Sequence, residues 1–281
     1  MTGARTRWTT AVSALAISAV LLVGCGSSKS STDGPAAAGP ATTAPVAGPL
    51  KILVTNDDGY DAKGIDAVVE GLRALPDTQV TVVAPLTNQS GTGGKTTPGT
   101  LTATDVKTLS GYPAKAVNGY PADTITWAID QHGIDFTPDL VVSGINFGQN
   151  VGPLVNISGT VGAARAAAAR GIPALASSQG LGDPADFPAG VAQVLSWLSM
   201  QRAALASGKD KEPVLLENLN IPTCTSGAVR PLVEVPIATG GDAAAALAPS
   251  DCSSTATNPP DDVTAFGEGF VVLSTLPLTP Q

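Results

Sequence analysis

Histidine and cysteine are scarce in this sequence, which contains one His, His132, and three Cys among 281 residues. A serine hydrolase needs a base beside its nucleophile, normally a His, and the sequence contains no G-x-S-x-G motif. His132 stands in a polar segment near Gly133 and Pro138, so we expect a surface side chain and not a catalytic base. A zinc site of Cys and His ligands is also disfavoured, because no C-x-x-C spacing occurs.

Charge is scarce as well, and basic charge most of all. Charged residues make up 14% of the chain, with 15 Lys and Arg against 23 Asp and Glu, so the formal net charge is −8. Proteins that bind nucleic-acid polymers neutralise phosphates with a basic surface, and we therefore expect no such polymer as a partner. A small anionic substrate is compatible with this composition if a bound cation supplies the local positive charge.

The beginning of the chain has the features of a lipoprotein signal. Arg5 and Arg7 precede an apolar run over residues 11–23, which is too short to span a bilayer comfortably and is typical of a secretory signal peptide. Leu22-Val23-Gly24-Cys25 then resembles a bacterial lipobox, in which Cys25 becomes the lipidated first residue of the mature protein. The alternative is an uncleaved anchor helix, and with either one the folded part lies outside the cytoplasm.

The next segment is expected to be a tether. Residues 26–49 are mostly Ser, Thr, Ala, Gly and Pro, and they carry too few bulky apolar side chains to fold. We therefore divide the chain into a signal peptide (1–24), a lipidated Cys with a flexible tether (25–49), and one folded domain (50–281). Cys224 and Cys252 remain as a pair in an oxidising compartment, and we expect a disulfide between them.

The folded part alternates strand and helix patterns. Residues 51–55 form an apolar run of strand length, apolar residues recur at helical spacing from Ile65 to Leu75, and residues 79–84 form a second β-rich run. A strand, a helix and a strand in this order imply a parallel pair joined by a right-handed crossover. The pattern returns with a strand over residues 139–143, a Gly-rich turn, a helix and a run over residues 172–177, while residues 240–260 are expected to be loop. We predict a Rossmann-like three-layer α/β/α sandwich with a mostly parallel sheet and a divergent C-terminal extension.

Polar residues follow several of these strands. Asn56-Asp57-Asp58-Gly59 comes after the first strand, Ser90 after the second, and Asn146 after a later one. The carboxyl ends of parallel strands meet at the ligand-binding edge of an open sheet, and carboxylate, hydroxyl and amide oxygens are the ligands that Mg²⁺, Mn²⁺ and Ca²⁺ prefer. The alternative is an ordinary turn, because Asn, Asp and Gly are common turn formers.

Ser158-Gly159-Thr160 precedes an Ala-rich segment that is predicted to be helical from about residue 161 to residue 170. A small hydroxyl residue at a helix start caps the helix, and the free amide groups and dipole there suit a phosphate. The alternative is an ordinary cap, which every helix needs.

Taken together, these motifs resemble the SurE family of stationary-phase survival proteins, and the resemblance covers nearly all of the folded part. It implies a metal-dependent nucleotidase that acts on nucleoside monophosphates or other small phosphate esters. The residues that carry it are Ile52–Tyr60, Val83–Pro85, Asn88, Ser90, Gly91, Gly119–Asp123, Val141–Asn146, Ser158–Val161, Asn218–Pro222 and Gly269–Val271.

Carried over residue by residue, the resemblance implies a site. Asp57 and Asp58 would be catalytic, with Asp57 our choice for helping to activate a water, although Asp58 could exchange roles with it. The divalent metal (Mg²⁺, Mn²⁺ or Ca²⁺) would be bound by Asp57, Asp58, Ser90 and Asn146. The phosphate pocket would be lined by Asn56, Gly144, Ser158, Gly159 and Thr160.

The chain also departs from the family pattern. Gln89 stands where a basic residue is usual, Ile157 replaces a common Tyr, and residues 223–260 differ in the region from which the family's dimers draw contacts. A homodimer is therefore an open expectation. Our hypothesis is an extracytoplasmic, lipid-anchored phosphomonoesterase, a 5′/3′-nucleotidase, attached to the membrane only through its lipid. The alternative is a lipoprotein that binds nucleotide or metal without catalysis.

Overall fold

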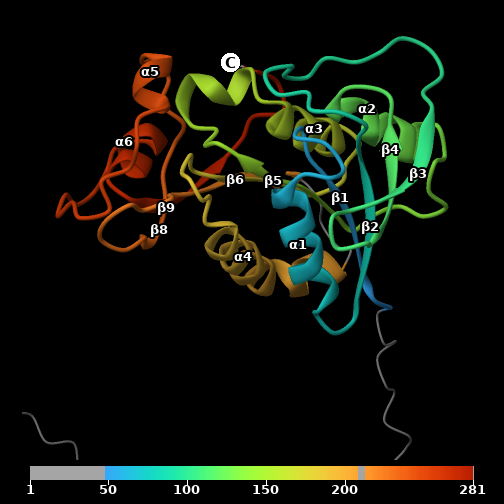
Figure 1. Cartoon of the computed structure of the whole chain (residues 1–281), viewed down its shortest axis with the longest axis horizontal. Helices are drawn as coiled ribbons and strands as arrows, with labels where there is room; N and C mark the ends of the chain where they lie inside the picture. Colours follow the sequence, from blue (N-terminus) through green and yellow to red (C-terminus); the bar gives the residue numbers. More distant parts are fainter. Residues whose placement is uncertain (1–47, 208–212, 281) are drawn as a thin grey trace, which may run out of the picture. The chain divides into compact units, whose positions relative to one another are not determined.

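The computed structural model describes residues 48–207 and 213–280 (Figure 1). The predicted signal peptide, Cys25 and nearly all of the predicted tether lie outside the described residues, so those predictions stay open. Within the described part, no helix combines the length and the apolar character that crossing a membrane requires.

The helices and strands alternate along the chain as the sequence pattern predicts. The strands are β1 (Leu50–Thr55), β2 (Thr78–Pro85), β3 (Ala103–Lys107), β4 (Pro113–Val117), β5 (Leu140–Phe147), β6 (Ala174–Gln179), β7 (Leu216–Ile221), β8 (Arg230–Glu234) and β9 (Phe270–Thr275). The helices are α1 (Lys63–Arg73), α2 (Pro121–Ile125), η1 (Thr126–Asp130), η2 (Gly152–Asn156), α3 (Gly159–Ala168), α4 (Phe187–Ser207), α5 (Ala243–Ala246) and α6 (Asp262–Gly267).

All nine strands form one sheet in the order β3-β4-β2-β1-β5-β6-β7-β9-β8. The central strands β4, β2, β1, β5, β6 and β7 are mutually parallel. The strand β3 is antiparallel to β4, and β9 is antiparallel to β7, whereas the edge strand β8 is parallel to β9. The chain leaves β1 toward β2 on one side and later returns to β5 on the other side. This reversal makes the gap beyond the carboxyl ends of β1 and β5 the topological switch point, where open α/β sheets bind ligands.

Helices cover both faces of the sheet, which confirms the predicted three-layer α/β/α sandwich. In Figure 1, α1 and α4 lie below the sheet and α2 and α3 lie above it. The strand β1 shows why both faces need a cover: Ile52 and Val54 belong to the buried cluster on the α1 and α4 side, and Leu53 belongs to the cluster on the α3 side. Successive side chains of a strand point to opposite faces, so an uninterrupted apolar strand requires two helical layers.

The two helices that flank the switch point differ in how they pack. In α1, four buried side chains at helical spacing (Ile65, Val68, Val69 and Leu72) form the apolar stripe that faces the sheet. The helix α3 instead consists mostly of Gly and Ala, and a Cβ at Gly162 would lie 2.1 Å from the carbonyl oxygen of Gly93. The small residues of α3 therefore let the loop after β2 approach the helix backbone.

The strand β5 is longer than the sequence pattern predicts. We expected a strand over residues 139–143 followed by a Gly-rich turn, but β5 continues to Phe147, with an irregular register between Ser143 and Asn146. The irregularity lets a strand continue through Gly144. It also carries Asn146 and Phe147 to the carboxyl edge of the sheet.

The C-terminal part of the chain forms a small third cluster around Phe266, Phe270 and Val272. In Figure 1 it lies at the left, where α5 and α6 stand beside β8 and β9. Residues 240–260, which we expected to be loop, contain the short helix α5. Cys224 and Cys252 are joined in a disulfide with their Cα atoms 5.8 Å apart, so the connection after β7 is tied to this part.

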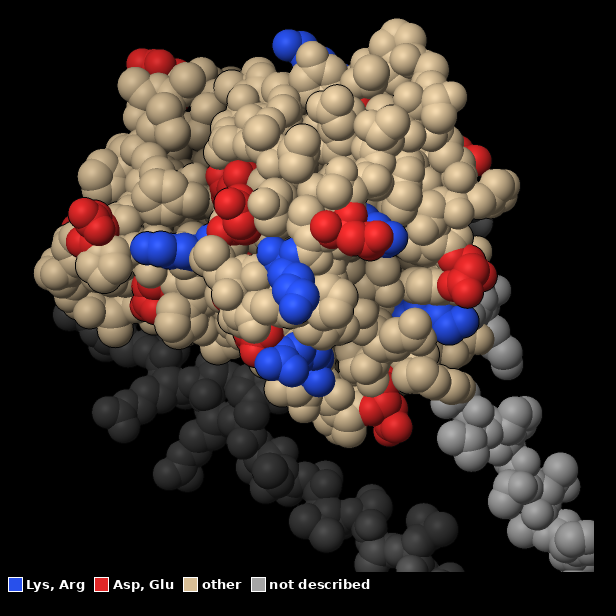
Figure 2. Space-filling model, turned by 45° about the vertical axis from the view of Figure 1, so that its right-hand side comes forward, with Lys and Arg blue, Asp and Glu red and all other residues tan. Residues whose placement is uncertain are grey.

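The surface carries few charges of either sign. On the face that Figure 2 shows, Lys and Arg side chains stand singly among Asp and Glu, and uncharged residues occupy most of the area. His132 is exposed in the loop after η1, as expected for a surface side chain. No continuous basic patch is visible on this face.

Candidate active site

The turn after β1 is closed by the side chain of Asn56. Its amide Nδ2 donates to the carbonyl oxygen of Gly59 (2.8 Å), and the Gly59 amide donates to Asn56 Oδ1 (3.3 Å). Gly59 has a φ of +108°, a backbone conformation that favours glycine. The fully buried Asn56 therefore shapes the turn that carries Asp57 and Asp58, and its predicted contact with the phosphate stays a prediction.

Asp57 is 3% exposed and is held by the start of α3. The hydroxyl of Thr160 donates to Asp57 Oδ1 at 2.6 Å. Burial raises the pKa of Asp57, while hydrogen bonds from the Thr160 side chain and from backbone groups, including those of Gly159 and Thr160, lower it. A Cβ at Gly159 would lie 2.8 Å from the Asp57 Cβ, so only glycine lets the helix start come this close.

Asp58 is held from two other segments. The backbone amide of Phe147, at the end of β5, donates to Asp58 Oδ2 at 3.0 Å, and Asn88 Nδ2 donates to Asp58 Oδ1 at 3.3 Å. Burial and the neighbouring charge of Asp57 raise the pKa of Asp58 to about 6, although the hydrogen bonds from Phe147 and Asn88 oppose this. The buried carboxylate of Asp57 and the half-buried carboxylate of Asp58 thus repel each other at the switch point.

The loop after β2 brings Ser90 to the same turn. The amide of Gln89 donates to the backbone oxygen of Asp57 (2.7 Å), and the Ser90 amide donates to Asn88 Oδ1 (2.9 Å). Ser90 is exposed. The loop therefore packs against the Asp57-Asp58 turn. Ser90, a predicted metal ligand, lies on the solvent side of this turn.

Asn146 reaches the turn from β5. Its side chain is buried, and its Nδ2 donates to the carbonyl oxygen of Gly148 at 2.5 Å. This bond uses the nitrogen and leaves Oδ1 as an oxygen that could bind a cation. Gly144 lies two residues earlier with a φ of +144°, and a Cβ there would meet the carbonyl oxygen of Ser177 at 2.3 Å. Gly144 is thus required for close packing against β6.

Ser158 caps α3, as its position before the helix predicts. Its side-chain oxygen accepts from the amide of Val161 at 3.1 Å. Because backbone groups of Gly159 and Thr160 are directed at Asp57, the α3 start supports the carboxylate that the sequence places in the metal shell. Its predicted contact with a phosphate stays a prediction.

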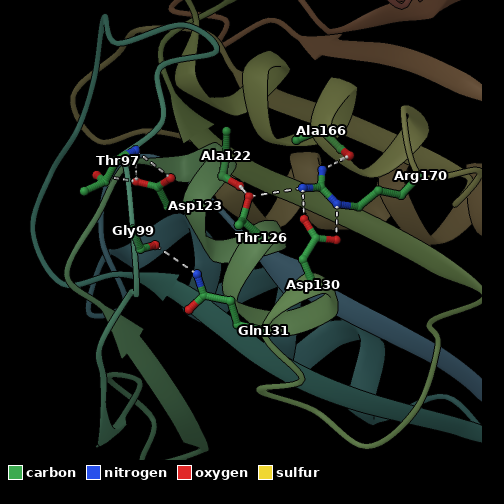
Figure 3. A network of polar contacts seen from close by, with 9 residues as sticks. All are labelled: Thr97, Gly99, Ala122, Asp123, Thr126, Asp130, Gln131, Ala166 and Arg170. Atoms are coloured by element: carbon green, nitrogen blue, oxygen red, sulfur yellow. Dashed lines mark hydrogen bonds and ion pairs between the residues drawn. The ribbon is translucent and has the colours of Figure 1, made fainter.

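A polar network behind α3 fixes this region (Figure 3). The fully buried Asp123 of α2 accepts from the amide and the hydroxyl of Thr97 and from the amide of Tyr120. Near the other end, Arg170 pairs with Asp130 and donates to the backbone oxygen of Ala166 (2.7 Å). The network joins the 97–99 loop, α2 with η1, and the end of α3.

The residues around the turn fit a hard divalent cation. In the described part of the chain, neither Asp57 nor Asp58 forms an ion pair with a Lys, Arg or His, and both have raised pKa values. A cation beside them would relieve that repulsion. Among the residues described, no three His, Cys, Asp or Glu side chains gather as a metal site, so a shell here needs the oxygens of Ser90 and Asn146 as well.

A groove of about 450 Å³ opens directly beside Asp58. We call it the aromatic groove. Asp58, Asn88 and Phe147 line it on the side of the turn, residues 62–64 line it at the start of α1, and residues 182–185 with Phe187 line it at the start of α4.

Sequence reasoning missed several residues of this region. Phe147, Phe187 and Gly64 were not singled out, and nothing in a linear pattern joins β5, α1 and α4 at one groove. Thr160 was expected to bind phosphate, but its direct bond to Asp57 was not foreseen. Asn88 was among the residues that carry the resemblance, but its hydrogen bond to Asp58 was not foreseen.

Comparisons with known proteins agree with this arrangement. The model of the family "Survival protein SurE" matches residues 52–240. The 5′-nucleotidase SurE of Pelobacter propionicus is 38% identical over 182 residues, covering 65% of this chain and 70% of the relative. The 5′-nucleotidase SurE of Synechococcus sp. (strain WH7803) is 40% identical over 188 residues, covering 66% and 67%.

A third relative aligns over a smaller share of both chains. The 5′-nucleotidase SurE of Methanopyrus kandleri is 45% identical over 137 residues, which is 48% of this chain and 50% of the relative. Among solved structures, the SurE protein from Aquifex aeolicus superimposes with a TM-score of 0.64 at 25% identity, covering 82% of this chain and 94% of that protein. The matched range includes the Asp57-Asp58 turn, Ser90, Asn146 and the α3 start. The chain therefore belongs to the SurE family of survival proteins.

Proposed function

We propose that this protein is a divalent-metal-dependent phosphomonoesterase, a 5′/3′-nucleotidase that converts nucleoside monophosphates to nucleoside and inorganic phosphate. The relatives named 5′-nucleotidase SurE, at 37–45% identity, support this activity. The observation that carries the proposal is the buried carboxylate of Asp57 beside the half-buried carboxylate of Asp58 at the switch point of the sheet. Such a pair is costly to bury unless it binds a cation.

The residues have separate tasks in this proposal. Asp57, Asp58, Ser90 and Asn146 hold the divalent metal through oxygen atoms. When bound, the metal neutralises phosphate oxygens and lowers the pKa of a coordinated water. Asp57 also accepts a proton from the attacking water.

Thr160 sets the direction of that carboxylate through its 2.6 Å hydrogen bond to Oδ1. A fixed carboxylate loses less free energy to reorganisation when it accepts the proton. Gly159 matters because it lets the helix start approach Asp57, whose Cβ would otherwise lie 2.8 Å from an added Cβ.

The test is phosphate release by the purified protein from adenosine, guanosine, cytidine and uridine monophosphates. Each substrate is assayed with Mg²⁺, Mn²⁺ or Ca²⁺ and again after treatment with a chelator. We expect release that disappears with chelator and returns when metal is restored. Nucleotide binding measured by calorimetry without any metal-dependent release would instead favour the non-catalytic lipoprotein.

We also propose that the mature protein works outside the cytoplasm, attached to the membrane by a lipid on Cys25. Support comes from the sequence alone, from the charged start, the apolar run over residues 11–23 and the lipobox-like Leu22–Cys25. Fractionation should find the wild-type protein in the membrane fraction, with a lipidated N-terminal peptide in mass spectrometry. A Cys25→Ser variant that remains equally membrane-bound would contradict the lipid anchor.

The homodimer that the resemblance implies stays part of the proposal. Light scattering of the purified protein at several concentrations checks it, with a mass of twice the protomer as the expected result.

A further inference from the structure

The aromatic groove adjoins the proposed reaction centre without a break. Asp58 belongs to the carboxylate pair and also lines the groove. The amide of Phe147 donates to Asp58 Oδ2 at 3.0 Å, so the backbone that carries the Phe147 side chain contacts the carboxylate directly. A phosphate ester bound at the turn would therefore have its organic half within reach of the groove.

Two aromatic rings line the aromatic groove. Phe147 is the last residue of β5 and Phe187 is the first residue of α4, and their ring centroids lie 6.5 Å apart with planes inclined by 56°. Phe147 is 49% exposed, which is unusual for a large apolar side chain fixed at the end of a central strand. An exposed ring beside a polar site is available for stacking against a planar group.

Phe187 packs closely against Gly64 at the start of α1. A Cβ at Gly64 would lie 1.8 Å from the carbonyl oxygen of Ile145 and 2.9 Å from Phe187 Cε1. The α1 start therefore packs directly against β5 and against the second ring, and the groove wall contains no side chain at that point. Its volume of about 450 Å³ lies in the range of small-molecule sites.

Charge in the groove is nearly balanced. Asp58 and Asp183 contribute carboxylates, and Lys63 at the start of α1 contributes an ammonium group. Such a lining does not select a second phosphate group, and it suits a neutral planar ring. A sugar without a base would have no planar group to stack against the exposed Phe147 ring.

We propose that the aromatic groove binds the base of a nucleoside monophosphate and that Phe147 and Phe187 select phosphate esters that carry a planar aromatic group. This inference rests on the proposed function, because it assigns the organic half of the substrate to a site beside Asp58. It identifies Phe147 as a residue that determines specificity and takes no part in the chemical step.

The experiment compares adenosine 5′-monophosphate with ribose 5-phosphate, which has the same kind of ester and lacks the base. For the wild-type protein we expect kcat/KM to be at least tenfold higher with the nucleotide. Phe147→Ala should lower kcat/KM for the nucleotide about tenfold, mainly through KM, because base stacking is lost. With ribose 5-phosphate the loss should be clearly smaller than with the nucleotide, because that ester has no base to stack on the ring.

Two further variants separate stacking from general damage. Phe147→Trp keeps an aromatic ring and should retain the preference for the nucleotide. Leu109→Ala is the matched control, because Leu109 is an exposed apolar side chain (59%) in the loop between β3 and β4 and does not line the groove. Equal loss for both substrates in Phe147→Ala, or equal wild-type activity on both, would overturn the inference.

The outcome also distinguishes this inference from the proposed function. Release from both esters without preference removes the groove assignment and leaves the phosphomonoesterase intact. If no ester is hydrolysed, adenosine binding measured by calorimetry decides the inference alone: binding weakened about tenfold by Phe147→Ala supports it, and binding that is absent or unchanged overturns it.

Discussion

At the scale of single residues, Asp57 depends on the first turn of α3. Thr160→Val removes the hydroxyl that donates to Asp57 Oδ1 and keeps the side-chain shape. We expect the free energy of unfolding to fall by about 1–3 kcal/mol, because the buried carboxylate loses a charged hydrogen bond. Chemical denaturation measures this change. Thr104→Val, at an exposed position of β3, is the control and should change stability by no more than about 0.5 kcal/mol.

Asp58 contributes to the pH dependence of stability. Its pKa of about 6 in the folded protein exceeds the ordinary value of 3.8, so the folded state holds its proton more tightly than the unfolded state does. In metal-free protein, the free energy of unfolding should therefore fall as the pH rises from about 4 to 6, by roughly 1–3 kcal/mol, and then level off.

Urea denaturation at pH 4.5 and pH 7.5, in the presence of chelator, measures that difference. Asp58→Asn should make that difference smaller, because the amide does not titrate, while the raised pKa of Asp57 leaves a further contribution. A divalent cation should act in the opposite direction, and the increase in Tm that it causes should be larger at pH 7.5 than at pH 5, where protons compete for the carboxylates. A wild-type protein equally stable at both pH values would contradict the repulsion that we describe.

At the scale of elements, the start of α3 joins a capped helix to the site. Ser158 accepts from the amide of Val161, and Ser158→Ala should lower the free energy of unfolding by about 1 kcal/mol. Ser158→Asn should restore most of it, since Asn is also a good cap. The midpoint of thermal unfolding for the three proteins checks this, and an unchanged midpoint in Ser158→Ala would mean that the cap contributes nothing.

The helices and strands differ in how well the sequence pattern predicts them. β1, α1 and β2 were predicted almost to their ends, because apolar residues alternate or recur at helical spacing there. The continuation of β5 to Phe147 was missed, since Gly144 and the irregular register interrupt the strand pattern. The long helix α4 was not identified, because its apolar residues do not gather on one face.

The closeness of the turn after β1 to the end of β5 could be predicted from the sequence, whereas the contacts within the candidate site could not. Parallel strands place their carboxyl ends at one edge, so topology alone brings the turn after β1 to the end of β5. The partners of each carboxylate were not predictable, because the bonds from Thr160 and Phe147 join residues about 90 to 100 positions apart in the chain. The aromatic groove was not predictable either, because it forms only where β5, α1 and α4 meet.

At the scale of the whole molecule, the disulfide ties the C-terminal extension to the segment after β7. Cys224 and Cys252 are 28 residues apart, and closing a loop of that length stabilises the folded state by about 3–4 kcal/mol in the chain-entropy model. Cys224→Ser with Cys252→Ser should lower the free energy of unfolding by up to that amount. Unfolding in urea with intact and reduced wild-type protein provides the matched comparison.

The same extension is also held through Asp262, which accepts from the amides of Gly152 and Ala238 at 2.8 Å. The extension thereby contacts η2, which leads into α3. Loss of the disulfide should leave the parallel sheet folded, so that hydrogen exchange rises in β8 and α6 before it rises in β1 and β5. Equal exchange throughout would mean that the extension and the sheet unfold as one unit.

The central claim is that the Asp57-Asp58 turn holds the metal for phosphate ester hydrolysis, and Asp57→Asn tests it most directly. The change keeps the size of the side chain and an acceptor for the Thr160 hydroxyl. The purified wild-type protein and variant are assayed for phosphate release from nucleoside monophosphates with divalent metal, alongside circular dichroism of both. We predict a loss of turnover of at least a hundredfold with an unchanged fold. Full activity in Asp57→Asn would contradict the account.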